Sequence, residues 1–537
     1  MIGGRRTAHV VAMACVVWGA AGHAQNSRQT AAPFQVVEAS VADIHAAFAR
    51  GTLTARALTQ QYLDRIEAYD KRGPSLNAII TINPRALEDA ARLDAQFKRT
   101  GPVGPLHGIP ILVKDEIDTA GMPTTLGTLV FKDYRPPADA FVIDRLRKAG
   151  AIILGKTTLS EFAAGDTYGS MFGVTRNPYD PTRTAGGSSG GSGAALAASL
   201  STLAIGEETA ASIRRPGGWN ALVTLRPTPG LVSRTGMWDA YPTTAAQMGP
   251  MARTVTDLAK MLDVMAGYDA EDPLTALGVN VKHLPYTNYL KRNGLKGARI
   301  GVIRDLLGSA TDPASAEFKA VDTVFARNVA ELKAAGATVI DPLVIPDLKK
   351  LLAVRATNPE LADEAMALYL GRTPEWPLRT REAIGNHPDM DKAMPPAKAT
   401  QWRSRPAKTD WAQWGAYLRA REQLTINIAK VMADNRLDAI VHKTVEIPPV
   451  AIAEAIDPPY RSGTNYVSTV NTFLVFAASM TVPSGFTDSG LPTGITFFGP
   501  AYSEPTLLTL AYAYEQATHH RAPPKTTPPL GTRAATN

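Results

Sequence analysis

A lysine closes one of the hydrophobic runs in the first quarter of the chain. Lys114 directly follows Ile111-Leu112-Val113, within residues 108–118. A side chain at the end of a buried strand is drawn toward the interior, and burial lowers the pKa of a lysine amine. The pattern therefore predicts a lysine that could act as a base near neutral pH, although lysines at strand ends are also common without any catalytic role.

A loop rich in glycine and serine, residues 186–193, contains Ser188 and Ser189 and runs directly into the alanine-rich residues 194–198. A flexible linker would stay polar on both sides, so this composition indicates a loop that leads into a helix N-terminus. Helix N-termini often bind phosphate. The loop lacks the Lys-Ser/Thr ending of a P-loop, and no predicted strand leads into it, which disfavours a nucleotide site.

The same loop also fits the G-x-S-x-G pattern, with Ser188 at its centre. That pattern raises an alternative, an α/β-hydrolase esterase with a Ser-His-Asp triad. Such a site needs a strand immediately before the serine, whereas residues 177–181 are predicted to be turn and coil. His442, His519 and His520 lie downstream and could complete the triad, although the last two fall at an exposed-looking helix end.

A third segment places Ser212 in a turn of small residues after the predicted strand 203–205. Consecutive backbone N–H groups in such a turn can point at one spot, as they do in an oxyanion hole.

Taken together, these segments resemble the amidase signature family. The pattern of that family runs from a Gly-Gly-Ser-Ser-Gly-Gly-Ser loop through an alanine-rich helix to a Gly-Gly-Ser-Ile-Arg turn. Its two key serines stand 24 residues apart, as Ser188 and Ser212 do here. The lysine block at 108–118 is similar to the other marker of the family. The resemblance covers about residues 36–521, with further matches at 122–125, 153–157, 176–179, 226–234, 249–254, 482–486 and 490–494.

The resemblance implies a serine hydrolase that uses no histidine, metal or cofactor. By motif position, Ser212 would be the nucleophile, Ser188 a bridging serine held by a cis peptide, and Lys114 the base. A neutral lysine would take a proton from Ser188, which takes one from Ser212, and the proton would return to the leaving nitrogen. Water would then release the acyl-enzyme. Ser–Lys arrangements are a known variant of triad chemistry.

The resemblance also assigns supporting groups. The oxyanion would be held by the backbone N–H groups of Thr209, Ala210, Ala211 and Ser212. The side chains expected to support the site are Ser189, Glu208 and Arg214.

The turn before Ser212 departs from the family pattern. The family usually has Thr-Asp before the turn and two glycines in it, where this chain has Glu207-Glu208 and Ala210-Ala211. Alanine resists positive φ at a cost of roughly 1 kcal/mol, so a loop that needs that conformation would shift. Two carboxylates pointing inward would raise the pKa of Lys114. A catalytically impaired binding protein with an amidase fold therefore stays open.

Strand-like and helix-like segments alternate through most of the chain, which is typical of an α/β protein with a largely buried sheet. The resemblance implies a central, mostly parallel mixed sheet, twisted and flanked by helices on both faces. The expected strands are 111–113, 152–154, 203–205, 300–303, 437–441 and 496–499. The expected helices are two within 40–69, then 140–149, 194–200, 318–332, 472–478 and 506–516.

Two regions fall outside that alternation. Residues 346–414 form an insertion that holds Trp376, Trp402, Trp411 and Trp414. Aromatic clusters more often pack than recognise ligands, so we favour an extra helical layer over a cover for the substrate. Residues 522–537 contain four prolines and are expected to be disordered.

The N-terminus resembles a signal peptide. Arg5 and Arg6 precede the apolar residues 10–21, and small residues come just before Gln25, so residues 1–24 are expected to be removed and 25–35 to form a linker. The apolar run is shorter than the roughly 20 residues of a membrane span. Cys15, the only cysteine, lies in the same segment, which excludes disulfides and thiolate chemistry from the mature chain.

The sequence therefore predicts an exported amidase, periplasmic or secreted, with one large domain at residues 36–521. Its expected substrates are small uncharged or aromatic amides, together with carbamates and esters. It would act as a monomer or homodimer, without stable membrane insertion. The positive charges behind its net charge of +7 are scattered, so nucleic acid is not expected as a partner. The glutamine-donating subunits of transamidation complexes share the fold, but an exported chain would not join a cytoplasmic complex.

Overall fold

The computed structural model describes residues 1, 3–4, 34–281, 285–468, 470, 474 and 476–531. The chain divides into two units, Met1–Phe34 and Gln35–Asn537, and all helices and strands described here belong to the second. Most of the predicted signal peptide and most of the predicted linker therefore lie outside the described residues.

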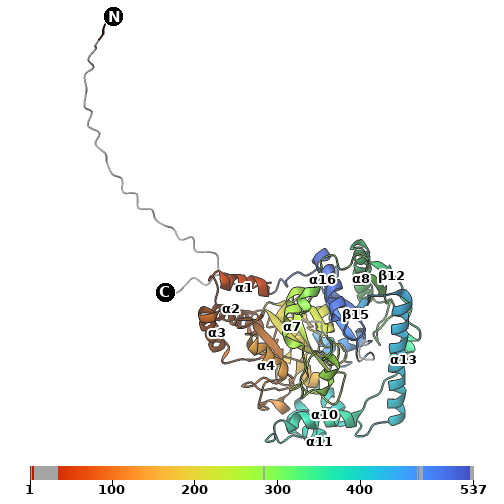
Figure 1. Cartoon of the computed structure of the whole chain (residues 1–537). Helices are drawn as coiled ribbons and strands as arrows, with labels where there is room; N and C mark the ends of the chain where they lie inside the picture. Colours follow the sequence, from red (N-terminus) through yellow and green to blue (C-terminus); the bar gives the residue numbers. More distant parts are fainter. Residues whose placement is uncertain are drawn as a thin grey trace. The chain divides into compact units, whose positions relative to one another are not determined.

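The hydrophobic runs predicted as strands all join one sheet of 11 strands (Figure 1). Their order across the sheet is β1-β3-β2-β8-β10-β9-β14-β15-β13-β11-β12. The strands are β1 (Ile79–Ile82), β2 (Pro110–Lys114), β3 (Ile152–Thr157), β8 (Leu203–Glu208), β9 (Val223–Arg226), β10 (Gln247–Ala252), β11 (Arg299–Val302), β12 (Thr338–Ile340), β13 (Ala439–Lys443), β14 (Ala478–Phe486) and β15 (Pro492–Gly499).

The sheet is mixed, as expected, but it is not mostly parallel. Parallel pairing joins β3, β2 and β8 near one edge and β13, β11 and β12 at the other, while the strands between them pair antiparallel. The centre is antiparallel partly because only a short loop joins β14 to β15, and so short a connection cannot join parallel neighbours. The prediction of a helix at 472–478 is wrong at its described end, since Ala478 opens β14.

Helices flank this sheet, and apart from 472–478 the predicted helices are present within a few residues (Figure 1). A capping box starts the first of them, in which the Ser40 side chain accepts from the backbone N–H of Asp43. The helices are α1 (Val41–Ala49), α2 (Ala55–Arg65), α3 (Ala86–Thr100), α4 (Phe141–Lys148), α5 (Gly190–Ala197), α6 (Arg214–Trp219), α7 (Val255–Met265), α8 (Ala316–Ala334), α9 (Leu348–Ala353), α10 (Pro359–Gly371), α11 (Arg381–Gly385), α12 (Ala397–Arg403), α13 (Trp411–Asn435), α14 (Ile452–Ile456) and α16 (Glu504–Thr518).

Two small hairpins stand apart from the main sheet. One joins β4 (Tyr168–Gly169) to β5 (Gly173–Val174), and the other joins β6 (Arg176–Asn177) to β7 (Asp180–Thr184). The second hairpin corrects the prediction of turn and coil before the glycine-rich loop. It forms a separate two-stranded sheet, with one isolated bridge from Arg183 to Ala451, so it is not the main-sheet strand that an α/β-hydrolase serine requires.

The insertion at 346–414 folds as the helical layer that the sequence favours. Helices α9 to α12 lie within it, and Trp402 is buried in a cluster with residues from elsewhere in the chain, such as Phe131 and Phe162. Trp376 packs against that cluster, whereas Trp411 stays exposed.

The prediction of a disordered tail is wrong for residues 522–531. The buried guanidinium of Arg65 donates hydrogen bonds to the carbonyl oxygens of Thr527 and Pro528, at 2.9 and 2.8 Å. Prolines do not prevent this attachment, because the tail offers backbone carbonyls, which prolines keep. Residues 532–537 lie outside the described part.

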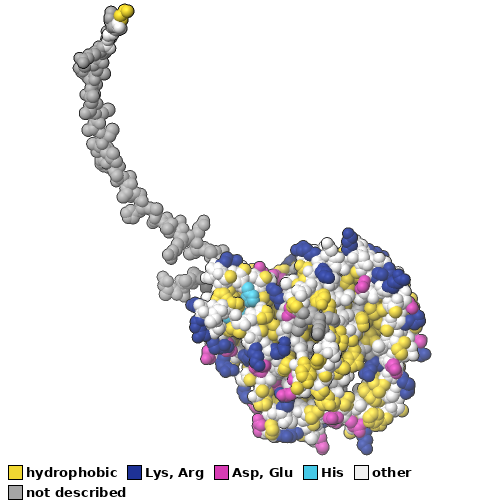
Figure 2. Space-filling view, viewed as in Figure 1, with side chains coloured by type: hydrophobic (Ala, Val, Ile, Leu, Met, Phe, Trp, Pro, Cys, Tyr) yellow, Lys and Arg dark blue, Asp and Glu magenta, His cyan; other side chains and the backbone are white. Residues whose placement is uncertain are grey.

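Positive charge is spread over the face seen in Figure 2, where Lys and Arg side chains lie scattered among neutral and acidic ones. Within the described ranges, no helix combines the length and the apolar character needed to cross a bilayer.

Candidate active site

Lys114 ends β2, a strand that is buried along its whole length between β3 and β8. Its side chain is fully buried, and its Nζ donates a hydrogen bond of 2.6 Å to Oγ of Ser188. The structure thus brings together the predicted strand-end lysine and the first serine of the glycine-rich loop, 74 residues apart in sequence.

Two carboxyl groups reach the same amine. Nζ of Lys114 lies 2.7 Å from Oε1 of Glu116 and 2.9 Å from Oε2 of Glu207, and both glutamates are buried. Burial lowers the pKa of the Lys114 amine, but the neighbouring carboxyl groups of Glu116 and Glu207 together outweigh burial and raise it. This direction is opposite to the lowered pKa that burial alone predicts for a strand-end lysine. The expectation that an inward-pointing carboxylate raises this pKa holds for Glu207.

The glycine-rich loop holds Ser188 in a fixed position. The Gly187–Ser188 peptide bond is cis, as the family resemblance implies. A Cβ at Gly187 would lie 2.3 Å from the carbonyl oxygen of Gly165, so only glycine allows this close approach. The guanidinium of Arg215 donates to the carbonyl oxygen of Gly187 at 2.7 and 3.0 Å, which fastens the loop to α6.

Ser189 connects this loop to the other two parts of the site. Its Oγ donates to the carbonyl oxygen of Glu207 at 3.0 Å, and its N–H donates to the carbonyl oxygen of Ser212 at 3.1 Å. Ser189 therefore supports the relative positions of the loop, the end of β8 and the turn of Ser212.

The turn from Thr209 to Ser212 is held by a buried ion pair. Glu208 accepts hydrogen bonds from the backbone N–H groups of Ile213 and Arg214 and from the Arg214 guanidinium, at 2.8 to 3.0 Å. Burial raises the pKa of Glu208, but the charges of Arg214 and Arg226 outweigh burial and lower it. Glu208 is thus an ionised anchor for the turn and does not face Lys114.

The two alanines in the turn fit without strain. Neither Ala210 nor Ala211 has a positive φ, so the conformational cost considered for replacing glycine does not arise. The N–H groups of Ala211 and Ser212 donate to no acceptor in the described part of the chain. The turn therefore presents backbone donors beside a half-buried serine.

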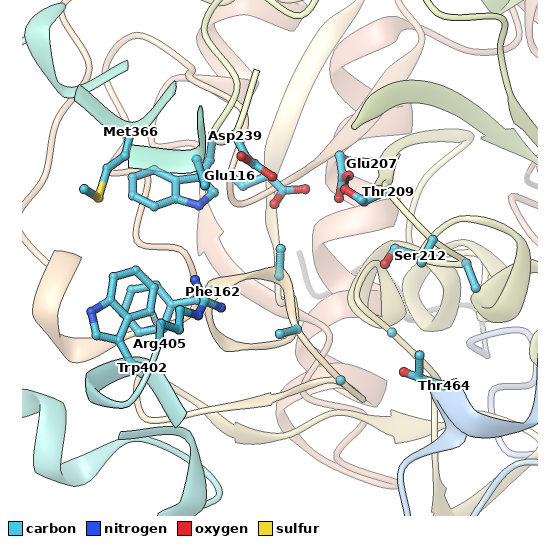
Figure 3. A pocket seen from close by; sticks show the side chains of 18 of the residues that line it. Glu116, Phe162, Glu207, Thr209, Ser212, Asp239, Met366, Trp402, Arg405 and Thr464 are labelled. Carbon is cyan, nitrogen blue, oxygen red and sulfur yellow. Dashed lines mark hydrogen bonds between the residues drawn. The ribbon is translucent and has the colours of Figure 1, made fainter. Parts of the chain in front are cut away.

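A pocket of about 380 Å³ opens at Ser212. Figure 3 shows Ser212, Glu207 and Thr209 on one side of it, and Phe162, Met366, Trp402 and Arg405 on the other. Phe162 and Trp402 are in ring contact at 4.4 Å, and the Arg405 guanidinium lies 4.9 Å from the Trp402 ring. The insertion thus supplies a wall of the pocket as well as a packing layer.

Three acidic residues that line the pocket, Glu116, Asp239 and Asp363, are missing from the sequence predictions. Glu116 stands two residues beyond Lys114. In an extended chain, side chains two residues apart point to the same side, so this spacing could have placed Glu116 beside Lys114. Asp239 carries no such signal, because it follows Trp238 in a loop far along the chain. Burial, followed by the charge of Glu207, raises the pKa of Asp239 to about 7.

The histidines do not support the alternative triad. His442 is buried on β13, where its Nδ1 contacts the Lys443 carbonyl oxygen at 2.7 Å, and burial lowers its pKa to about 3. His520 is paired with Glu331 at 2.8 Å. Across the described ranges, no histidine contacts Ser188.

Comparison with known proteins agrees with this geometry. The family model named Amidase matches residues 57–508. A glutamyl-tRNA(Gln) amidotransferase subunit of Symbiobacterium thermophilum is 34% identical over 498 residues, which cover 91% of this chain and 99% of that protein.

Solved structures agree with the match. The peptide amidase of Stenotrophomonas maltophilia superposes with a TM-score of 0.80 and 35% identity, covering 92% of this chain and 100% of that one. A bacterial aryl acylamidase shares the fold, with a TM-score of 0.75 and 24% identity over 89% of this chain and 96% of that one. The chain belongs to the amidase signature family.

Proposed function

We propose that this protein hydrolyses amides, with Ser212 as the nucleophile, Ser188 as the bridging serine and Lys114 as the base. The observation that carries the proposal is the 2.6 Å contact between Lys114 Nζ and Ser188 Oγ, buried beside the pocket that Ser212 lines. A lysine in contact with a serine hydroxyl has the chemistry needed to move a proton between them.

The reaction would proceed through an acyl-enzyme. The neutral amine of Lys114 takes the proton of Ser188 as Ser188 takes that of Ser212, and the Ser212 oxygen attacks the amide carbon. The proton returns along the same relay to the leaving nitrogen, which departs as amine or ammonia. Water then cleaves the acyl ester and leaves a carboxylic acid.

The negative charge of the tetrahedral intermediate would be held by the backbone N–H groups of residues 209–212. The unengaged donors of Ala211 and Ser212 support this assignment. A donor of this kind contributes roughly 3 kcal/mol to the stability of the transition state in other hydrolases.

We propose small uncharged or aromatic amides as substrates, with carbamates and esters as further ones. The support is the pocket wall of Phe162, Trp238, Met366 and Trp402, which offers apolar and aromatic contact. The likeness to a peptide amidase points in the same direction.

The first prediction concerns the relay. Purified protein should release ammonia or nitroaniline from simple amides, and Ser212→Ala, Ser188→Ala and Lys114→Met should each lower kcat at least about a thousandfold, because the three groups act as one unit. Ser192→Ala is the matched control. Its hydroxyl bonds to Thr157 and to a backbone carbonyl, away from the relay, so activity should remain. Full activity in any of the three relay variants would contradict the proposal.

A second candidate is a component of an amidotransferase complex, which the identity to the Symbiobacterium thermophilum protein favours. The two candidates differ in what the isolated chain does. A free-standing amidase turns over small amides alone, whereas a component of a complex would hydrolyse glutamine and need partner chains for its full activity.

We further propose that the protein is exported, on the support of the arginine pair, the apolar run and the small residues before Gln25. N-terminal sequencing of the protein from its own host should begin at Gln25. A mature chain that begins at Met1 would contradict export by this route.

A further inference from the structure

The amine of Lys114 donates three hydrogen bonds, to Ser188 Oγ at 2.6 Å, to Glu207 Oε2 at 2.9 Å and to the Glu207 carbonyl oxygen at 3.3 Å. Glu116 Oε1 also lies 2.7 Å from it, and all of these residues are buried. An ammonium has three N–H donors and no acceptor, so this environment matches the protonated amine. The neutral amine that the relay needs would have one donor fewer and a lone pair.

The two glutamates are not equivalent. Glu207 accepts on both carboxylate oxygens, from Lys114 at Oε2 and from the Thr209 hydroxyl at Oε1, each at 2.9 Å. Oε1 of Glu116 is buried and receives no well-directed hydrogen bond in the described chain, although it lies close to Lys114. Hydrogen bonds to a carboxylate favour its ionised form. Glu207 is therefore the carboxylate whose oxygens are both satisfied, whereas burial raises the pKa of Glu116 well above its usual range.

Other charged groups around Lys114 are already paired or lie further into the pocket. Lys156 on the neighbouring β3 is paired with Asp115 at 2.9 Å, and Glu208 on β8 is paired with Arg214 at 2.8 Å. Asp239 lines the pocket without an ion pair to any described residue. Glu207 is thus the carboxylate best placed to fix the charge of Lys114.

We propose that Glu207 is a positioning residue that holds Lys114 as an ammonium in the resting protein, while Glu116 stands beside it as a neutral acid. The base then forms only when the ammonium releases a proton to solvent, so the protein works in an alkaline range set by Glu207. This inference rests on the proposed function.

The direction of the effect follows from the charges. Glu116 and Glu207 both stand beside the amine whose pKa is raised, and in the proposed state only Glu207 carries a charge. Removal of that charge should therefore lower the pKa of Lys114 and make the neutral amine available at lower pH. Replacement of a protonated Glu116 by the neutral, isosteric glutamine removes no charge and should leave the titration in place.

The experiment measures kcat/KM against pH, whose acid limb reports the ionisation of the free protein. The variants are Glu207→Gln, Glu207→Thr and Glu116→Gln. Loss of the Glu207 charge should move the acid limb by about one pH unit. At the pH where kcat/KM of the wild type is half its plateau value, kcat/KM of the two Glu207 variants should therefore be about nine-tenths of their own plateau values. Glu116→Gln should stay near half. Glu504→Gln removes a buried carboxylate that bonds to Thr228 outside the pocket and serves as the control, with an unmoved limb.

The inference would be overturned if the acid limb stayed in place in both Glu207 variants. It would also be overturned if Glu116→Gln moved the acid limb as far as the Glu207 variants do. The rate of inactivation by a fluorophosphonate, measured over the same pH range, reports the same limb without a substrate. If Ser212 is labelled but the limb does not move, this inference alone fails. If the wild type neither hydrolyses amides nor reacts with the reagent at any pH, the proposed function fails, and the inference falls with it.

Discussion

Glu208 is the residue on which the turn carrying Ser212 depends most. It is fully buried, and its carboxylate faces the guanidinium of Arg214 at 2.8 Å and that of Arg226 at 4.0 Å. It also accepts from two backbone N–H groups at the start of α6. One side chain therefore joins the end of β8, the turn and the next helix.

We expect Glu208→Gln to lower the free energy of unfolding by about 3–5 kcal/mol, because it removes the negative charge that two buried guanidinium groups face. It should also lower kcat, since the turn is no longer held. Urea denaturation and initial rates measure the two effects. Asp434→Asn, which removes an exposed ion pair with Lys430 on α13, should change neither. A Glu208→Gln protein as stable as the wild type would show that the turn is held by other contacts.

At this scale, residue types and spacing, read through the family resemblance, predicted the lysine and both serines. The structure brings Lys114 to Ser188, and Ser212 lines the pocket. The charge state of Lys114 was beyond the sequence, because it depends on Glu207 from a different strand. The strand pattern indicated that Lys114 is buried, and burial lowers the pKa of a lysine. It did not indicate the neighbouring carboxyl groups, which raise that pKa instead.

Among the elements, the helical insertion matters most for the pocket. It contacts the segment that follows β2 through a hydrogen bond in which the Tyr369 hydroxyl on α10 donates to Asp118 at 2.7 Å. A second hydroxyl contact, from Tyr134 to Thr373, lies at the end of the same helix at 3.0 Å. Burial raises the pKa of Asp118 to about 7, and the bond from Tyr369 opposes that shift.

Tyr369→Phe should destabilise the protein by about 1–3 kcal/mol, because it leaves a buried carboxyl without its donor. The hydrogen bond favours the ionised carboxylate of Asp118, and in the folded protein Asp118 is ionised only above about pH 7. The loss of unfolding free energy should therefore be larger at about pH 8.5 than at about pH 5.5. Denaturation at both pH values tests this. Tyr134→Phe, which loses a neutral partner, should show a loss that does not change with pH. Equal losses for Tyr369→Phe at both pH values would contradict the assignment.

Periodicity predicted most elements, but it failed at β14. The sequence around Ala478 reads as a short apolar run, which a buried helix and a buried strand share. Pairing with β9 and β15 on either side decides for a strand, and no local pattern reports those partners. The hairpin of β6 and β7 was missed for a related reason, because its prolines and polar residues resemble coil.

For the molecule as a whole, the C-terminal segment closes onto the N-terminal helices. Arg65 on α2 donates to four carbonyl oxygens, those of Ala198, Ser199, Thr527 and Pro528. The proline content of this segment predicted disorder. Composition cannot report that a buried arginine far away in the sequence needs the carbonyl oxygens of the segment as acceptors.

Truncation after Arg521 should therefore lower the free energy of unfolding by about 3 kcal/mol, since two charge-assisted hydrogen bonds of Arg65 are lost. Removal of residues 532–537 alone breaks none of these bonds and is the control. Chemical denaturation of both truncated proteins provides the measurement. Two truncated proteins of equal stability would show that residues 522–531 contribute nothing.

The most direct test of the account is to label the purified protein with a fluorophosphonate and to identify the modified residue by peptide mapping. The account predicts one phosphonylated residue, Ser212, and loss of labelling in Lys114→Met. Labelling of Ser188 instead, or undiminished labelling of Ser212 without Lys114, would contradict the relay.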